Sequence, residues 1–261
     1  MTPRLVGMCH LPALPGTCSW HGDSLAKITE AALQDARTLE EAGFDAVLLQ
    51  NSLDRPTRER VDHLTVAQMT AIAATLKAAV GFAIGVNVIK NDGPAAMAIA
   101  AASGADFIRV KVLTGAVLSA EGIVTGCAAE THVLQARAGT SVKVWADCYD
   151  PTSRPLVEAD FGAAVTDAHD FGMADAVIVT GRDLDETMSL ARNTRAKSPR
   201  VPVAIGGKID ATSIRSALSV ADAVIVGSAL KREPGIAGRV DLDCAMRIAK
   251  SAAEETHPGN D

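Results

Sequence analysis

Short apolar runs alternate with amphipathic stretches along the whole chain, and four of the runs are introduced in the same way. Each of these four follows a helix end and an aspartate: Asp45, Asp106, Asp175 and Asp222. The aspartates are 61, 69 and 47 residues apart. Each gap is too long for one strand and helix unit and right for two. We therefore expect these runs to be the even-numbered strands of a regular repeat.

The odd-numbered strands are expected between them. Four short runs rich in β-formers and bounded by turn residues fill the gaps: 5–9, 81–88, 142–147 and 202–206. Helical signals separate the strands. Asp23 or Ser24 can cap a stretch of helical periodicity that stops at Gly43, and Pro94 suits the first turn of another helix. The pattern predicts eight strands that alternate with eight helices.

Eight similar units favour a single closed (β/α)8 barrel, the TIM barrel, over a doubly wound sheet. No GxGxxG motif opens the first helix, which also argues against the doubly wound alternative. The length of 261 residues fits one such domain over 1–261, with a polar, frayed end from about residue 250. Hydrophobic residues make up 48% of the chain but only eight are aromatic, which suits parallel strands buried on both faces.

Charge, cysteines and motifs exclude several functions. The net charge of −6, without a basic stretch, argues against nucleic acid as a partner. Five scattered cysteines without a CxxC pair predict neither disulfides nor structural zinc, so a reducing cytoplasm is expected. No apolar run approaches the roughly 20 residues that cross a bilayer. Serine hydrolase and P-loop chemistry are excluded because the GxSxG and Walker motifs are absent. Alanine-rich helices would permit a homo-oligomer.

In a (β/α)8 barrel the chemistry lies on the loops that follow the carboxyl ends of the strands. Asp147 ends the fifth strand, where barrel enzymes often place a base or a metal ligand, and we expect it to be the general base. His10 ends the first strand as a second acid or base, although a lone histidine can equally be a hydrogen-bonded side chain. A divalent metal at Asp147 and His10 is left open, and no cofactor is otherwise expected.

The fourth strand alternates two cations with apolar residues, so Arg109 and Lys111 share one face. Cations in a buried strand need an anion or a carboxylate beside them. We expect both to stabilise negative charge that develops on a substrate. Lys111 could also form a Schiff base if Arg109 lowers its pKa. The alternative is a structural ion pair with Asp147.

Other polar residues at the strand ends are candidates for substrate binding. They are Asn51, Asp54, Asn87 and Asp92 after the second and third strands, and Thr180 after the sixth. Amides and carboxylates there can orient substrate hydroxyls. Two alternatives stay open: Asp92 caps the helix that follows it, and Thr180 belongs to a corner of small residues that only turns the backbone.

The last two strands end in glycine corners that predict a phosphate site. The corners contain Gly206 and Gly207 after the seventh strand, and Gly227 and Ser228 after the eighth. Missing side chains expose backbone N–H groups, and a following helix start adds partial positive charge. A single Gly-Gly would be weak evidence, but two such corners on adjacent final strands are typical of a phosphate-binding barrel.

Taken together, these motifs resemble the BtpA family of the ribulose-phosphate-binding barrel superfamily. The resemblance covers nearly the whole chain and lies in residues 7–12, 85–88, 107–110, 179–181 and 226–228, with Asn51, Asp54, Asn91, Asp92 and Asp147. The chain departs from the family pattern at Lys111, where the family usually has asparagine. It also departs at residues 148–151, where a Lys-His pair is usual. Both departures lie near the expected barrel mouth.

The residues and the resemblance predict an enzyme that acts on a small phosphorylated metabolite. The substrate would be a sugar phosphate or a ribosyl or nucleoside phosphate, and the chemistry that of an isomerase, a lyase or glycosidic-bond cleavage. The family resemblance also implies an alternative, a non-catalytic biogenesis or assembly factor of the photosystem I type. An exposed apolar patch would favour that alternative, whereas charged groups converging in a closed mouth would favour the enzyme.

Overall fold

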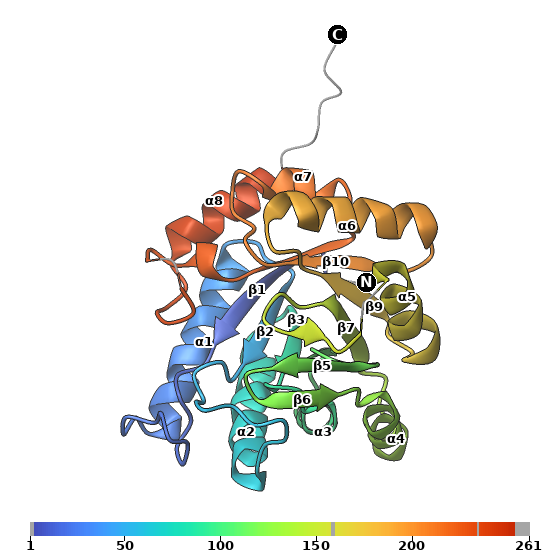
Figure 1. Ribbon diagram of the computed structural model, residues 1–261. Helices are drawn as coiled ribbons and strands as arrows, with labels where there is room; N and C mark the ends of the chain where they lie inside the picture. The colour runs from blue at the N-terminus through green and yellow to red at the C-terminus, as the bar shows by residue number, and fades with distance from the viewer. Residues whose placement is uncertain (1–2, 158–159, 234, 254–261) are drawn as a thin grey trace.

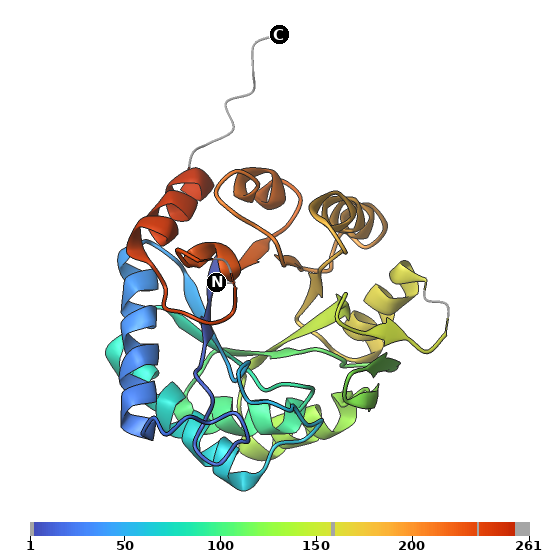
Figure 2. The same ribbon diagram turned by 60° about the vertical axis from the view of Figure 1, so that its left-hand side comes forward.

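A computed structural model of the chain shows a closed barrel of eight parallel strands surrounded by helices (Figures 1 and 2). The structure describes residues 3–157, 160–233 and 235–253. The strands follow one another around the barrel in the order β1, β2, β3, β4, β7, β9, β10, β11, and β11 pairs with β1. The predicted TIM barrel is thus confirmed.

The barrel strands are β1 Leu5–His10, β2 Ala46–Gln50, β3 Ala83–Asn87, β4 Phe107–Val110, β7 Lys143–Tyr149, β9 Ala176–Val179, β10 Val203–Gly206 and β11 Ala223–Val226. The α-helices are α1 Leu25–Glu41, α2 His63–Ala79, α3 Gly93–Ser103, α4 Ala128–Ala138, α5 Phe161–Thr166, α6 Leu184–Lys197, α7 Ile214–Leu218 and α8 Leu242–Ala253. A π-helix, η1 Asp167–Phe171, and a 3-10 helix, η2 Ser228–Leu230, complete the ring. None of these described helices is long and apolar enough to cross a membrane.

The four repeated aspartates clamp neighbouring strands together at their amino ends. Asp45 Oδ2 accepts the N–H of Leu5 at 2.8 Å, so the residue before β2 holds the start of β1. The other three aspartates accept the same kind of bond at 2.8 Å: Asp106 from the N–H of Ile84, Asp175 from that of Val144 and Asp222 from that of Val203. The repeat seen in the sequence is therefore one hydrogen bond used four times.

Side chains that point into the barrel form an apolar floor. Phe107 of β4 and Trp145 of β7 stack with their ring centroids 4.6 Å apart. Around them lie smaller inward residues from the other strands: Val6, Met8, Ala46, Leu48, Ala176, Ile178, Ala204, Ala223 and Ile225. Gly85 of β3 makes room for this stack, because a Cβ there would lie 2.3 Å from Phe107 Cζ. The scarce aromatic residues are thus placed where the barrel is filled.

One feature differs from the sequence-based expectation. Eight strands were expected, but the loops after β4 and β7 form a further antiparallel sheet of β5 Ala116–Ser119, β6 Gly122–Thr125 and β8 Arg154–Pro155. We call this sheet the flap; Figure 1 shows β5 and β6 beside the barrel strands. The frayed end predicted from about residue 250 stays a prediction, because 250–253 belong to α8 and 254–261 lie outside the described residues.

We predict that Gly85→Ala lowers the free energy of unfolding by about 1–3 kcal/mol, because its methyl group would displace the stacked rings. Urea denaturation would measure the loss, and near-UV circular dichroism would report the disturbed stack. The matched control is Gly162→Ala in the first turn of α5, where the nearest atom is 3.3 Å away and is a side-chain oxygen. Equal stability of both variants would contradict this account of the floor.

Candidate active site

The next inward position of every barrel strand lies one step above the apolar floor. Because side chains alternate along a strand, this position follows two residues after the last inward apolar residue. The eight residues are His10, Gln50, Asn87, Arg109, Asp147, Thr180, Gly206 and Gly227. We call them the polar ring. The ring brings together seven of the predicted site residues at the carboxyl ends of the strands.

Arg109 and Asp147 form a buried two-bond ion pair in this ring. Arg109 Nε donates to Asp147 Oδ2 at 2.9 Å, and Arg109 Nη2 donates to Oδ1 at 2.8 Å. Burial alone would lower the pKa of Arg109, but the charge and hydrogen bonds of Asp147 raise it overall. Both carboxylate oxygens are therefore engaged, and the ion-pair alternative weighed from the sequence is present. Asp147 fixes the guanidinium in place.

Lys111 lies above this pair in a line of alternating charges. Its ammonium is 3.7 Å from Asp147 and 3.8 Å from Asp150, and Asp150 is 3.9 Å from Lys90. Burial and then the charge of Arg109 lower the pKa of Lys111, against the opposing effect of the two aspartates. Lys111 and Asp150 are at two of the positions where the resemblance implies a departure from the BtpA pattern. A lysine with a lowered pKa can exchange a proton or attack a carbonyl near neutral pH.

His10 is held in one tautomer by Lys231, which follows β11. Lys231 Nζ lies 3.4 Å from His10 Nδ1 and also donates to the carbonyl oxygen of Ile236. The lysine is only 5% exposed. Burial, then Lys231 and Arg109, lower the pKa of His10 to about 4. An ammonium can only donate, so Nδ1 accepts and Nε2 carries the proton. At pH 7 His10 is a neutral hydrogen-bond donor.

The opposite arc of the ring contains only small residues. Gly206 packs so closely that a Cβ there would lie 2.9 Å from Thr180 Oγ1, and a Cβ on Gly207 would lie 2.7 Å from Thr180 Cγ2. Gly207 has a φ of +80°, which favours glycine. Among the described residues, Thr180 Oγ1 is one of three buried side-chain polar atoms without a hydrogen-bond partner. This arc therefore combines closely packed small residues with an unused donor.

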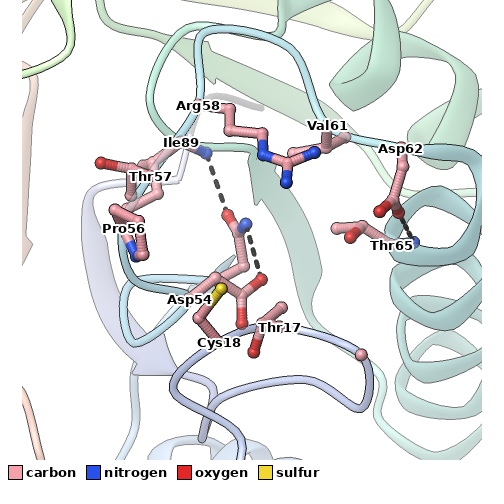
Figure 3. A pocket seen from close by; sticks show the side chains of 12 residues that line it. Thr17, Cys18, Asp54, Pro56, Thr57, Arg58, Val61, Asp62, Thr65 and Ile89 are labelled. Atoms are coloured by element: carbon pink, nitrogen blue, oxygen red, sulfur yellow. Dashed lines mark hydrogen bonds between the residues drawn. The ribbon is translucent and has the colours of Figure 1, made fainter.

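Three predicted site residues are engaged in holding loops together. Asn51 accepts the N–H of Ile89 and donates to Asp54, which in turn accepts the N–H of Leu14. Figure 3 shows Asp54 and Ile89 in the pocket that these loops line beside α2. Asp92 accepts the N–H of Ala95 and so caps α3, the alternative weighed from the sequence.

Asn87 remains in the ring and orders its neighbours. Its amide donates to the carbonyl oxygen of Arg109 at 2.8 Å and accepts from Gln50 Nε2. Gln50 also lines the open cleft at the barrel mouth, which we call the mouth cleft. The cleft is lined further by Lys90 and Lys111 from the barrel, Glu121 from the flap and Ile236 from the loop after η2.

The residues present do not form a metal site at Asp147 and His10. Both oxygens of Asp147 face Arg109, and His10 Nδ1 faces the Lys231 ammonium. Within the described part of the chain, no group of three or more His, Cys, Asp and Glu side chains could hold a metal ion. The donor set instead suits an anionic organic substrate, because cations and neutral donors converge on it.

Some site residues were given no role by the sequence reasoning. Ser52 and Glu121 had not been noticed, and nothing in their local sequence marks them. Lys231 was given no role either, because its contact with His10 joins positions 221 residues apart. Gln50 was recognisable from alternation alone, since it is two residues beyond Leu48.

These features define a TIM barrel with a polar mouth at the carboxyl ends of its strands. The BtpA family model matches residues 1–254, and the chain belongs to the BtpA family. The photosystem I biogenesis protein BtpA of Synechocystis sp. is 34% identical over 260 residues, covering 96% of this chain and 88% of that protein. An uncharacterized protein of Thermococcus kodakarensis is 39% identical over 252 residues, covering 96% of this chain and 95% of that one.

Solved structures share the fold at low sequence identity. N-(5'-phosphoribosyl)anthranilate isomerase from Pyrococcus furiosus matches with a TM-score of 0.58 and 13% identity, over 95% of this chain and 98% of that chain. Orotidine 5'-phosphate decarboxylase from Pyrococcus horikoshii matches with a TM-score of 0.60 and 14% identity, over 96% of this chain and 100% of that chain. Both are similar in architecture, and neither assigns an activity to this chain.

We predict that His10 titrates near pH 4 in the folded protein, followed by NMR of its ring signals. The pKa of His10 in the folded chain lies below the ordinary value of 6.5. Between these two values the unfolded chain therefore binds a proton at this residue and the folded chain does not. The stability due to neutral His10 is therefore complete above pH 6.5 and is lost as the pH falls from 6.5 to 4.

Lys231→Met should raise the pKa of His10 and weaken the preference for the Nε2–H tautomer, which ¹⁵N shifts report. The control is Arg232→Met, which removes an exposed cation at the next position. A pKa of His10 that Lys231→Met leaves unchanged would contradict the role given to Lys231.

Proposed function

We propose that the chain is an enzyme that binds a small phosphorylated substrate across the barrel mouth and moves a proton beside a carbonyl group. The observation that carries the proposal is the division of the polar ring. One arc, from His10 to Asp147, holds charged groups and hydrogen-bonding side chains, and the other holds a threonine and two glycines. Such a division separates a reacting end from a binding end.

The small-residue arc supports phosphate binding. Phosphate oxygens accept hydrogen bonds well, and Thr180 Oγ1 is a buried donor without a partner. Bulky side chains are missing at Gly206, Gly207 and Gly227, so a phosphate can approach the backbone closely. The two enzymes of known structure named above, which share the fold with this chain, act by their names on phosphoribosyl and 5'-phosphate compounds. A sugar phosphate or a ribosyl phosphate fits this arc best.

The other arc supports proton transfer through an enolate. In this scheme Lys111 first gives up its own proton, which its lowered pKa favours, and its amine then takes the proton from carbon. Arg109 and the Nε2–H of His10 donate to the carbonyl oxygen as it gains negative charge. Asp147 keeps the role of positioning Arg109 rather than that of the general base. An isomerase and a lyase share this step, and a Schiff base on Lys111 would use the same lowered pKa.

We predict that Gly227→Asp abolishes the thermal stabilisation that phosphorylated compounds give to the protein, since the new carboxylate would repel phosphate. Gly227→Asn is nearly the same size without the charge and is the matched control. A Cβ at Gly227 meets its nearest neighbours at 3.5 Å, an ordinary contact, and the two variants add side chains of nearly the same shape, so their difference reports the charge. Differential scanning fluorimetry against a panel of sugar and nucleoside phosphates measures the effect. Stabilisation that survives Gly227→Asp would overturn the phosphate arc.

An assembly role is the second candidate, and one observation favours it. The outer face of the flap is apolar and exposed: Leu118 and Ile123 are directly paired and are 48% and 59% exposed. Leu156 and Val157 beyond β8 are 48% and 78% exposed. Val124 on the inner face is fully buried, so the exposure belongs to one side of the sheet. Such a face can bind a partner protein or a second copy of the chain.

The two candidate functions predict opposite results when variants are tested for complementation of a strain of the source organism that lacks the gene. If the chain is an enzyme, Lys111→Met abolishes complementation and Ile123→Ser retains it. An assembly factor gives the reverse, because Ile123→Ser removes apolar contact area and Lys111→Met leaves the surface intact. Western blots of both variants control for expression.

A further inference from the structure

A second buried hydroxyl without a partner lies at the barrel mouth. Ser52 is 7% exposed, and its Oγ is one of the three unpartnered buried side-chain atoms in the described chain. The residue lines the mouth cleft together with Lys90 and Lys111. A buried hydroxyl that bonds to nothing is unfavourable until a ligand satisfies it. The unpartnered hydroxyl of Ser52 therefore points to a bound ligand rather than to a role in the fold.

Ser52 lies directly across the barrel from Thr180. Ser52 follows β2 and Thr180 follows β9, and the strand order places four strand steps between β2 and β9 in either direction. The two hydroxyls therefore lie on opposite sides of the barrel. A substrate that satisfies both must span the mouth and carry an acceptor group at each end.

The charges beside Ser52 define what kind of group is bound there. Lys90 Nζ donates to Thr152 at 3.1 Å, and its carboxylate neighbours Glu121 and Asp150 are 4.0 and 3.9 Å away. A lysine ammonium has three donors, and separations near 4 Å are too long for direct hydrogen bonds. Lys90 therefore keeps donors for a ligand.

The charge balance of the cleft fits one negative charge. Three cations line it, Arg55, Lys90 and Lys111 in its protonated form, and the carboxylates within ion-pair distance of these lysines are Glu121, Asp150 and Asp147. The Arg109 and Asp147 pair is neutral by itself. One positive charge is left over, which a carboxylate neutralises and a second phosphate would exceed.

We propose that Ser52 and Lys90 form a carboxylate subsite, so that the substrate is a phosphorylated acid with its carboxylate at the end remote from the phosphate. The proposal rests on the proposed function for the position of the phosphate at Thr180. The carbons between the two anionic groups would lie over the apolar floor, beside Lys111 and Arg109. Sugar-acid phosphates and phosphorylated hydroxy or keto acids are the classes that meet this description.

Isothermal titration calorimetry with matched probe pairs tests the subsite. The first pair is 6-phosphogluconate and sorbitol 6-phosphate, and the second is 3-phosphoglycerate and glycerol 3-phosphate. Each pair differs by a carboxylate in place of a CH2OH group. We expect the acid of the pair that spans the mouth to bind on the order of tenfold more tightly than its alcohol, because its carboxylate gains charge-assisted hydrogen bonds.

Variants assign that preference to the subsite. Ser52→Ala and Lys90→Met should reduce the preference for the acid and leave the affinity for the alcohol unchanged. Ser216→Ala, the same chemical change on the exposed surface of α7, is the control. In the ligand-free protein Ser52→Ala should leave the Tm unchanged or raise it, because the lost hydroxyl has no partner. A lower Tm would show that Ser52 has a structural role and would overturn the proposal.

The outcomes separate this proposal from the proposed function. If acid and alcohol bind equally in both pairs, the carboxylate subsite is overturned and the phosphate arc stands. If no phosphorylated probe binds, the proposed function fails, and gluconate, which has the carboxylate alone, decides the subsite. Binding of gluconate that Ser52→Ala removes supports the subsite, and no binding of gluconate overturns it.

Discussion

Closure of eight parallel strands turns the inward side chains of all the strands toward one interior, where residues from alternate strands stack in layers. The whole site depends on this constraint. Around Phe107 and Trp145 the interior is apolar and filled, and two residues further along each strand it holds the polar ring. The floor excludes water from below, so the charges above it interact in a medium of low polarity. An open sheet would spread the same residues along an edge.

The buried pair of Arg109 and Asp147 is stable only as a pair. Removing either partner would leave an unpaired charge in the interior, which typically costs about 3–5 kcal/mol. The pair also changes its surroundings, because the charge of Arg109 adds to burial, the main cause, in lowering the pKa of Lys111 and of His10. One ion pair thus contributes to the protonation state of both groups. Both oxygens of Asp147 bond to Arg109, whereas the sequence alone suggested a free base.

The barrel could be predicted from the sequence because the patterns that indicate it are local and recur along the chain. Alternation predicted that Arg109 and Lys111 share a face, and strand ends predicted Asn87, Thr180 and the glycines near the mouth. Asn51 was also expected at the mouth, but alternation turns it away from the interior, because its neighbour Gln50 points inward. Asn51 instead forms hydrogen bonds with Asp54 and Ile89 in the loops. The flap and the roles of Ser52 and Lys231 depend on loops that fold over the barrel. No periodicity reports such contacts, since they join residues far apart in sequence.

The aspartate clamps lie at the amino ends of the strands, and the polar ring lies at the carboxyl ends. Each clamp bonds to backbone N–H, which every residue except proline has, so it places little demand on the side chain that it holds. The two ends of the barrel consequently place separate demands on the sequence. Residues at the mouth can change, and with them the molecule that is recognised, without a new way to hold the barrel closed.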